Sequence, residues 1–424
     1  MSNPHKLTAS HAEEASLSLT QLLNPEVLAD PYPFYHRLRT QDPVHWDPFL
    51  HAWLITRYDD VVKVLRDCSS DRALGPEELN TLGLQDLKPV GQVMMKQMIF
   101  LDAPAHTRLR ALASQAFTPR RIKVLRAHIQ QIADRLLDDV QGRSHFDVIS
   151  DLAGPLPAIV SAEFLGLPTD DHRQLKAWSE DFGEVLGNFQ HNPDRVPSVL
   201  RSVEAMTEYF KAAIFDQHRS PREGLINSFM SAECDGDRFT DEEIVANCII
   251  TMVGAQETTT NLIGSGALIL AKHPDARNAL MNDPTLMPSA VEELLRFESP
   301  SHHTARIARA DFQLGDKLVR KGTALIAVMA AANRDPERFP EPDKFDIRRK
   351  ENRHVAFGWG AHFCFGAPLA RMEGAIAFET LLRRVPGWHI APGPLTWRTN
   401  LGLRGLESLP MLLNESAAAS SERH

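Results

Sequence analysis

The sequence predicts a mainly α-helical protein with a small β region. Apolar residues recur at the helical period from residue 105 to about residue 290. Strand-like runs, rich in β-branched and aromatic residues, occur near the N-terminus and again at 312–319 and 324–328. Prolines divide the helical part into separate helices, because proline cannot continue a helix. These breaks fall at Pro119, Pro155, Pro168, Pro193, Pro221 and Pro274.

The first hundred residues are predicted to alternate helices with a hairpin. Residues 30–39 open a helix, residues 45–56 read as a short hairpin, and residues 58–65 form the next helix. Residues 69–97 then read as a long irregular segment, since glycines and prolines interrupt it. Irregular segments of this length in a compact domain are usually functional. The interrupting residues are Pro76, Gly83, Pro89 and Gly91.

The longest predicted helix spans residues 241–272. Thr240 stands at its N-cap and Glu243 follows three residues later, which is the pattern of a capping box. At 1.5 Å per residue this helix would be about 48 Å long. A helix of this length can span a whole domain and carry a site at its middle.

Composition excludes several classes of protein. The formal charge of −9 argues against general nucleic-acid binding. The longest apolar run, 248–255, is far shorter than the roughly 20 residues that span a bilayer. The 4 cysteines are scattered without paired spacing, which predicts a reducing, cytoplasmic setting without disulfides or a metal knuckle. Residues 1–18 and 415–424 are predicted to be disordered.

One segment predicts the chemistry. Residues 357–371 read Phe-Gly-Trp-Gly-Ala-His-Phe-Cys-Phe-Gly-Ala-Pro-Leu-Ala-Arg, a glycine-rich loop that presents Cys364 and then begins a helix. The glycines at 358, 360 and 366 are expected to adopt positive φ and to let the backbone approach a flat macrocycle. Amides at the start of the following helix would stabilise a thiolate. We therefore interpret Cys364 as a thiolate ligand to haem iron.

This loop has three alternative interpretations. A lone cysteine is commonly a small buried apolar residue. A dinucleotide-binding loop is disfavoured, because Phe363 stands where the third glycine of that motif belongs. A zinc site is disfavoured because no second cysteine lies nearby.

The run F-G-x-G-x-H-x-C-x-G-x-x-L-A-R resembles the haem-binding signature of the cytochrome P-450 monooxygenases. The resemblance implies the cytochrome P-450 fold, with haem b between the 241–272 helix and the helix after the cysteine. It implies one catalytic domain over residues 19–414, with Cys364 as the axial ligand. The loop residues implied to contact the cofactor are Phe357, Gly358, His362 and Gly366.

The middle of the long helix resembles the oxygen-activation motif of the same family. It reads Gly-Ala-Gln-Glu-Thr-Thr over 254–259, where Ala255 would lie against the haem. Thr258 is expected to donate a hydrogen bond to the carbonyl of Gly254, which bends a helix. The resemblance implies that Glu257 relays protons from solvent and that Thr258 holds dioxygen or a water molecule. A surface glutamate beside packing threonines is the plainer alternative.

Further residues match the contacts that the family makes with the haem propionates. His106 and Arg110 stand four residues apart on one predicted helix, and can approach carboxylates from one side. The resemblance adds Arg306 and His362 to this set. An arginine on a helix is usually just solvated, so the match across separate segments is what favours this assignment.

A buried structural network is also implied. Glu293 and Arg296 share one helical face, and Arg349 follows in a later segment. These residues resemble the family's buried glutamate and arginine network, with Arg349 as its third member. Loss of one member would leave a partner charge unpaired.

The predicted activity is insertion of one oxygen atom from dioxygen into an apolar small molecule, such as a polyketide, terpenoid or aromatic metabolite. Electrons would come from a separate ferredoxin or flavodoxin with its reductase. This partner is predicted to dock near a basic segment through Arg108, Arg120, Arg121 and Lys123. Alternatives are a peroxide-using haem oxygenase and a haem sensor or electron carrier.

The substrate pocket is expected between segments that are far apart in the sequence. The expected walls are 69–100, 182–189, 250–255, 299–304 and 400–403. The polar groups expected in these walls are Asn188, His302, His303 and Asn400.

Overall fold

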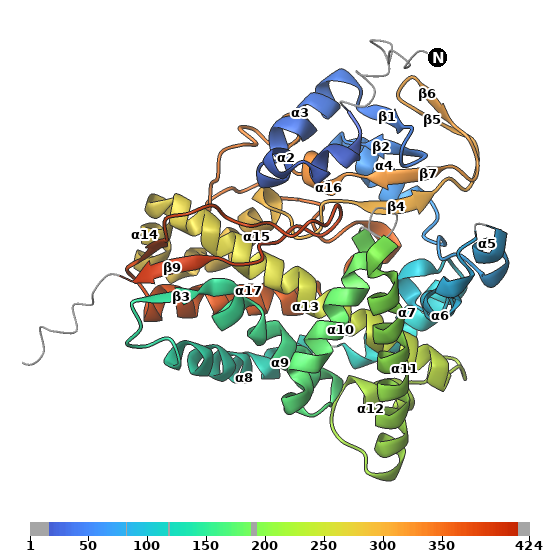
Figure 1. Cartoon of the computed structure of the whole chain (residues 1–424), viewed down its shortest axis with the longest axis horizontal. Helices are drawn as coiled ribbons and strands as arrows, with labels where there is room; N and C mark the ends of the chain where they lie inside the picture. Colours follow the sequence, from blue (N-terminus) through green and yellow to red (C-terminus); the bar gives the residue numbers. More distant parts are fainter. Residues whose placement is uncertain (1–16, 82, 118, 188–192, 414–424) are drawn as a thin grey trace, which may run out of the picture.

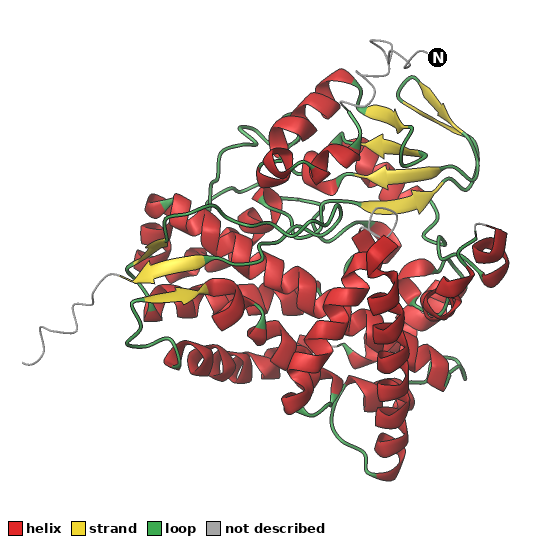
Figure 2. Cartoon of the chain, viewed as in Figure 1, coloured by secondary structure: helices red, strands yellow, loops and turns green. Residues whose placement is uncertain are grey.

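The computed structural model describes residues 17–413 except 82, 118 and 188–192, and it confirms a mainly helical fold. Figure 2 shows helices through most of the molecule, with strands gathered in small groups at two places. The predicted long helix is α13 (Asp241–Lys272), and helices from the central and C-terminal parts of the chain pack against it (Figure 1). Its N-terminus has the predicted capping box between Thr240 and Glu243.

The largest sheet joins an N-terminal hairpin to two strands from residues 304–327. It has the order β1 (Val44–Asp47), β2 (Ala52–Ile55), β7 (Ala324–Ala327) and β4 (Thr304–Ile307). The predicted hairpin is the antiparallel β1 and β2 pair, while β2 and β7 run parallel. Figure 1 shows the sheet beside the N-terminal helices α2 (Pro25–Ala29), α3 (Tyr32–Gln41) and α4 (Tyr58–Asp67), and beside α16 (Met329–Ala332) from the later part of the chain.

The helical part begins and ends its helices where the prolines predict. Pro119, Pro155 and Pro274 each stand first in a helix, where the missing amide hydrogen is not needed. The helices are α7 (Ala105–Ala116), α8 (Pro119–Asp138), α9 (Pro155–Leu165), α10 (His172–Gly187), α11 (Val196–Arg219), α12 (Leu225–Ser231), α14 (Pro274–Asn282), α15 (Met287–Phe297) and α17 (Ala367–Arg384).

The segment predicted to be irregular contains short helices instead. Pro76 is the first residue of α5 (Pro76–Thr81), and Pro89 lies in the first turn of α6 (Lys88–Met94). Both prolines begin helices here, whereas the sequence interpretation took them only as interruptions. Short 3-10 turns connect them at η2 (Gln85–Leu87) and η3 (Met98–Phe100).

The remaining strands are short. The predicted strand region at 312–319 is a hairpin of β5 (Phe312–Leu314) and β6 (Lys317–Val319). The sequence analysis missed β4, and it missed a second sheet of β3 (His145–Asp147), β9 (Pro410–Leu413) and β8 (Trp388–Ile390).

The N-terminal boundary needs a correction. Leu17 and Ser18 fall in the range predicted to be disordered, yet both are buried. Ser18 caps the short helix η1 (Leu19–Leu23) and donates a hydrogen bond to Asp47 at 2.8 Å. The rest of the ends predicted to be disordered, 1–16 and 415–424, lie outside the described residues, as does residue 414.

The buried core has two large clusters, and both include α13. Its N-terminal half, from Ile244 to Val253, packs with α10, α11 and α12. Its C-terminal half, from Leu262 to Leu270, packs with α9, α15 and α17. The approach to α17 is close: a Cβ on Gly266 would lie 2.3 Å from the Phe378 ring. Residues 254–258 of α13 therefore sit at the junction of the two clusters.

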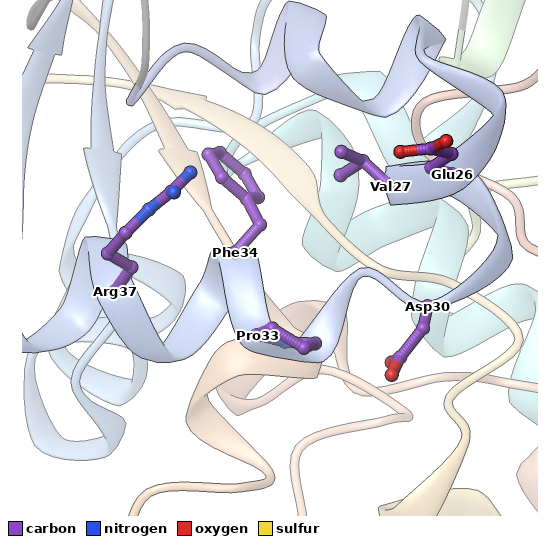
Figure 3. Close-up of a pocket in the computed structure, with 6 residues that line it drawn as sticks. All are labelled: Glu26, Val27, Asp30, Pro33, Phe34 and Arg37. Carbon is purple, nitrogen blue, oxygen red and sulfur yellow. The ribbon is translucent and has the colours of Figure 1, made fainter.

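No helix in the described part of the chain is long and apolar enough to cross a membrane. A surface hollow of about 410 Å³ lies at the N-terminal helices, where Val27 and Phe34 supply apolar walls and Arg37 a cation (Figure 3). Its other lining residues are Glu26, Asp30 and Pro33. It shares no residue with the cysteine loop, and we assign it no part in the chemistry.

Candidate active site

One face of α13 stays open in the middle of the core. Between residues 244 and 270 every residue is buried except Thr251, Gly254, Ala255 and Thr258. Their spacing of three, four and seven residues puts them on one face of the helix. We call these four residues the open strip. A helix that is buried on every other side leaves this strip for a bound molecule to cover.

The predicted hydrogen bond within the open strip is present. Thr258 Oγ1 donates to the carbonyl oxygen of Gly254 at 2.6 Å. A Cβ built on Gly254 would meet no described atom within 4 Å, so the absent side chain leaves free space. The strip therefore offers a flat backbone surface next to one hydroxyl group.

Glu257 is not a surface glutamate. Its side chain is buried, and its Oε2 accepts a hydrogen bond from Arg398 Nη1 at 2.6 Å. Burial raises the pKa of Glu257, and the Arg398 guanidinium partly opposes that rise. The sequence analysis missed Arg398, since no local pattern links it to a residue 141 positions away.

The cysteine loop has the predicted glycine conformations at two of three positions. Gly358 and Gly360 adopt φ of +70° and +72°, a region that favours glycine. Gly366 does not: its φ is −82°, and it serves as the N-cap of α17. Gly366 instead keeps space free, because a Cβ there would meet no described atom within 4 Å.

Cys364 is half-buried and is held by the loop. Its amide donates to the carbonyl of Phe357 at 2.8 Å. Burial raises the pKa of the Cys364 thiol, while the backbone amide of Gly366 and the guanidinium of Arg110 act in the opposite direction. These groups would stabilise a thiolate, as the helix start was predicted to do.

Arg110 braces this loop. Its Nη2 donates to the carbonyl of Phe363 at 2.9 Å, and its guanidinium lies 5.0 Å from the centre of the Phe365 ring. The side chain thus places a positive charge beside Cys364. His106, four residues earlier on α7, stacks on the ring of His362 instead.

Basic side chains gather beside the loop, and few acidic side chains lie near them. The rings of His106 and His362 stack at 4.0 Å between centres. Burial, followed by the charges of His106, Arg306 and Arg72, lowers the pKa of His362 to about 3. Asp102 is the acid in range, and it already pairs with Arg309 at 2.8 Å.

Arg306 is a buried cation without a carboxylate partner among the described residues. It is buried, and its Nε has no hydrogen-bond partner among the described residues. Burial lowers its pKa to about 10, as expected for a cation that lacks a counter-ion. Burial likewise lowers the pKa of Arg72 to about 9. The sequence analysis missed Arg72, which lies in the segment read as irregular.

These groups fit haem b. Cys364 would supply the thiolate ligand of the iron, and the flat backbone at Gly254 and Gly366 would accept the macrocycle. The cations Arg306 and Arg72 would hold the propionates, because buried arginines need carboxylate or phosphate partners. His106 and His362 are in position to donate hydrogen bonds to the propionates as neutral imidazoles.

The network on Glu293 has a fully buried centre, Glu293 and Arg296, and two partly buried members, Arg349 and Asn352. Glu293 accepts hydrogen bonds from Arg296 Nε and Nη2, both at 2.8 Å, and from Arg349 Nε at 3.2 Å. Asn352 adds a bond at 3.1 Å that the sequence did not predict. The remaining donors of Arg296 reach backbone carbonyls, including that of Asn333 at 2.9 Å. The network ties α15 to the segment that leads into the cysteine loop.

Several residues expected in the pocket walls pack or form hydrogen bonds within the fold. His302 is buried and bonds to the Tyr35 hydroxyl at 2.8 Å, while Phe182 is buried in the core. Asn400 is occupied in backbone hydrogen bonds, among them one to the carbonyl of Gly183 at 3.4 Å. Asn188 lies outside the described residues.

Comparison with known proteins agrees with this geometry. The family model "Cytochrome P450" matches residues 83–386. The chain is 37% identical over 400 residues to "Polyketide biosynthesis cytochrome P450 PksS" of Bacillus subtilis (strain 168), covering 91% of this chain and 96% of that protein. It is 37% identical over 400 residues to "Cytochrome P450 monooxygenase PikC" of Streptomyces venezuelae, covering 92% of each.

A solved structure gives the same answer for the fold. P450BioI, in complex with an acyl carrier protein ligated to hexadec-9Z-enoic acid, matches with a TM-score of 0.85 at 36% identity. The match covers 92% of this chain and 100% of that one. The cysteine loop, the open strip and the unpaired cations now have one explanation. The chain belongs to the cytochrome P450 family and is a haem b monooxygenase.

Proposed function

We propose that this monooxygenase oxidises an apolar small molecule with a long hydrocarbon or polyketide skeleton. Support comes from two similar proteins, one named for polyketide biosynthesis and one crystallised with a fatty acyl carrier protein. The observation that carries the proposal is the open strip of α13, where small residues leave room beside the Thr258 hydroxyl.

We propose distinct tasks for Glu257 and Thr258. A haem with a thiolate ligand supplies the chemistry that activates dioxygen and favours O–O cleavage. Thr258 would hold a water molecule at the open strip, because its hydroxyl is half-exposed and already oriented by Gly254. Glu257 would move protons from the α10 side of the helix. A carboxyl group with a raised pKa is suited to proton transfer near neutral pH.

The test measures product formed per electron consumed. The substrate is first identified by screening fatty acids, polyketide lactones and terpenoids for compounds whose binding shifts the spin state of the haem. Thr258→Ala should then divert most electrons to peroxide, because the hydroxyl that orients water is lost. Glu257→Gln should slow turnover by about 10- to 100-fold, in the range of general acid–base effects.

A matched control is Thr207→Ala on α11. Thr207 Oγ1 bonds to the Val203 carbonyl at 2.7 Å in the same geometry, away from the open strip. It should retain full coupling. Undiminished coupling in Thr258→Ala would refute the role of its hydroxyl. Equal product yield from added peroxide in Thr258→Ala and wild type, with none from dioxygen in either, would favour the peroxide-using alternative.

We also propose a ferredoxin or flavodoxin as electron donor, docked on the cysteine side of the molecule. Lys123 on α8 is exposed and suits an acidic partner. Arg108 suits it less, since it pairs with Glu243 and donates to the Arg238 carbonyl at 3.1 Å. The side chains of Arg120 and Arg121 lie outside the described part of the structure.

Charge reversal at Lys123 checks this surface. Lys123→Glu should slow first-electron transfer from an acidic ferredoxin several-fold at low salt, and the deficit should shrink as ionic strength rises. Lys321→Glu is the control, because Lys321 is equally exposed in the turn between β6 and β7. Equal transfer rates in both variants would exclude Lys123 from the docking surface.

A further inference from the structure

A chain of charged side chains leads from Glu257 to the surface of α10. Oε2 of Glu257 accepts from Arg398 Nη1 at 2.6 Å, and Arg398 Nη2 donates to Glu180 Oε1 at 3.3 Å. Lys176 donates to the same oxygen of Glu180. We call these four residues the Glu257 ladder. The exposed fraction of the side chain is 6% at Glu257, 24% at Arg398, 40% at Glu180 and 23% at Lys176.

The ladder joins three separate parts of the fold. Glu257 lies on α13, Glu180 on α10, and Arg398 on the segment that follows β8. The backbone amide of Arg398 donates to the carbonyl of Gly405 at 3.0 Å, which holds this segment in place. α10 also passes directly over the carboxylate, because a Cβ on Gly183 would lie 3.6 Å from Glu257 Cγ. The position of the Glu257 carboxylate therefore depends on α10.

The two oxygens of Glu257 have unequal surroundings. Oε2 is held by Arg398, while Oε1 is buried without a hydrogen-bond partner in the described part of the chain. A buried carboxylate oxygen without a partner is costly, so this oxygen is ready to accept a proton or a water molecule. One oxygen of the carboxyl group is thus hydrogen-bonded to Arg398, and the other can bind a proton or a water molecule.

The charges around Glu257 act with opposite signs. Burial raises its pKa most, Arg398 and Lys176 lower it, and Glu180 raises it. These groups come from both elements that pack against the carboxyl group. Loss of Arg398 must therefore move its titration in one direction and loss of Glu180 in the other.

We propose that Arg398 is a positioning residue for proton delivery, which holds one oxygen of Glu257 and so decides when this carboxyl group can exchange a proton. Glu180 modifies the interaction between Arg398 and Glu257, because it also pairs with Arg398 and connects it to α10. The proposal rests on the proposed function of Glu257, and it adds the residue and the helix that govern it.

The experiment titrates Glu257 in the resting ferric protein, without turnover. Subtracting the infrared spectrum of Glu257→Gln isolates the carbonyl band of the protonated Glu257 side chain. In Arg398→Gln the midpoint of this band should rise by about 1 to 3 pH units, as for loss of an adjacent opposite charge. Glu180→Gln should lower the midpoint. Arg398→Lys, which keeps the charge, should stay within a few tenths of a unit of wild type.

The control is Arg195→Gln. Arg195 Nη2 pairs with Asp181 on the same helix at 3.0 Å, but its partner is not on the Glu257 ladder. It should leave the midpoint unchanged. A midpoint that does not move in Arg398→Gln, or shifts of equal sign in Arg398→Gln and Glu180→Gln, would overturn the proposal. Arg398→Lys and Glu180→Gln preserve the test where Arg398→Gln folds poorly.

The pH profile of product formation separates this proposal from the proposed function. Because delivery needs the protonated carboxyl group, turnover should fall as pH rises through the midpoint, and this descending limb should move with the infrared midpoint. If Glu257→Gln turns over like wild type, the proposed function of Glu257 fails. If Glu257→Gln is slow but the descending limb of the pH profile stays at the same pH in Arg398→Gln, only the proposed role of Arg398 fails.

Discussion

Replacing Cys364 with serine is expected to reduce oxygenase activity to background while the fold persists. The thiolate is the group that pushes electron density to the iron and favours O–O cleavage, and a serine hydroxyl cannot replace it. Cys364→His should bind haem with the spectrum of a histidine-ligated haem. The measurement is the carbonyl adduct of the ferrous protein, whose long-wavelength band reports the thiolate.

The matched control is Cys234→Ser, because Cys234 is a half-exposed free cysteine outside the site. It should keep the long-wavelength band and full activity. Haem content and circular dichroism separate loss of chemistry from loss of fold. A wild-type protein without the long-wavelength band would contradict the assignment of Cys364 as the ligand.

Glu293→Gln is expected to lower the free energy of unfolding by about 3–5 kcal/mol, because it leaves the positive charge of Arg296 unpaired in the core. Both side chains are 0% exposed, so water cannot replace the lost partner. The network holds the segment before the cysteine loop, and haem loss should therefore accompany the destabilisation. Chemical denaturation and haem retention on dilution measure the two effects.

Glu292→Gln provides the comparison on the same helix. Glu292 pairs with Arg371 at 2.6 Å and with His354 at 3.2 Å, and its side chain is 29% exposed. Solvent screening should keep its loss of stability below that of Glu293→Gln. If the two variants were equally stable, burial would not be the source of the effect at Glu293.

Local patterns predicted the parts of the site that depend on neighbouring residues. The glycines at 358 and 360, the capping box at Thr240 and the bond from Thr258 to Gly254 all involve residues within four positions of one another. Such features follow from backbone conformation and short-range hydrogen bonds. The same reasoning failed at Gly366, where the loop needs free space rather than positive φ.

The division between what the sequence determined and what the tertiary structure decided follows the range of the interactions. The sequence by itself determined the cysteine loop, the long helix and the family. Only the tertiary structure placed Arg398 on Glu257, Arg72 among the unpaired cations and Asn352 on Glu293. These partners are brought together by packing of distant elements, and the energy of a buried charge depends on all of its neighbours at once. No local pattern along the chain records that arrangement.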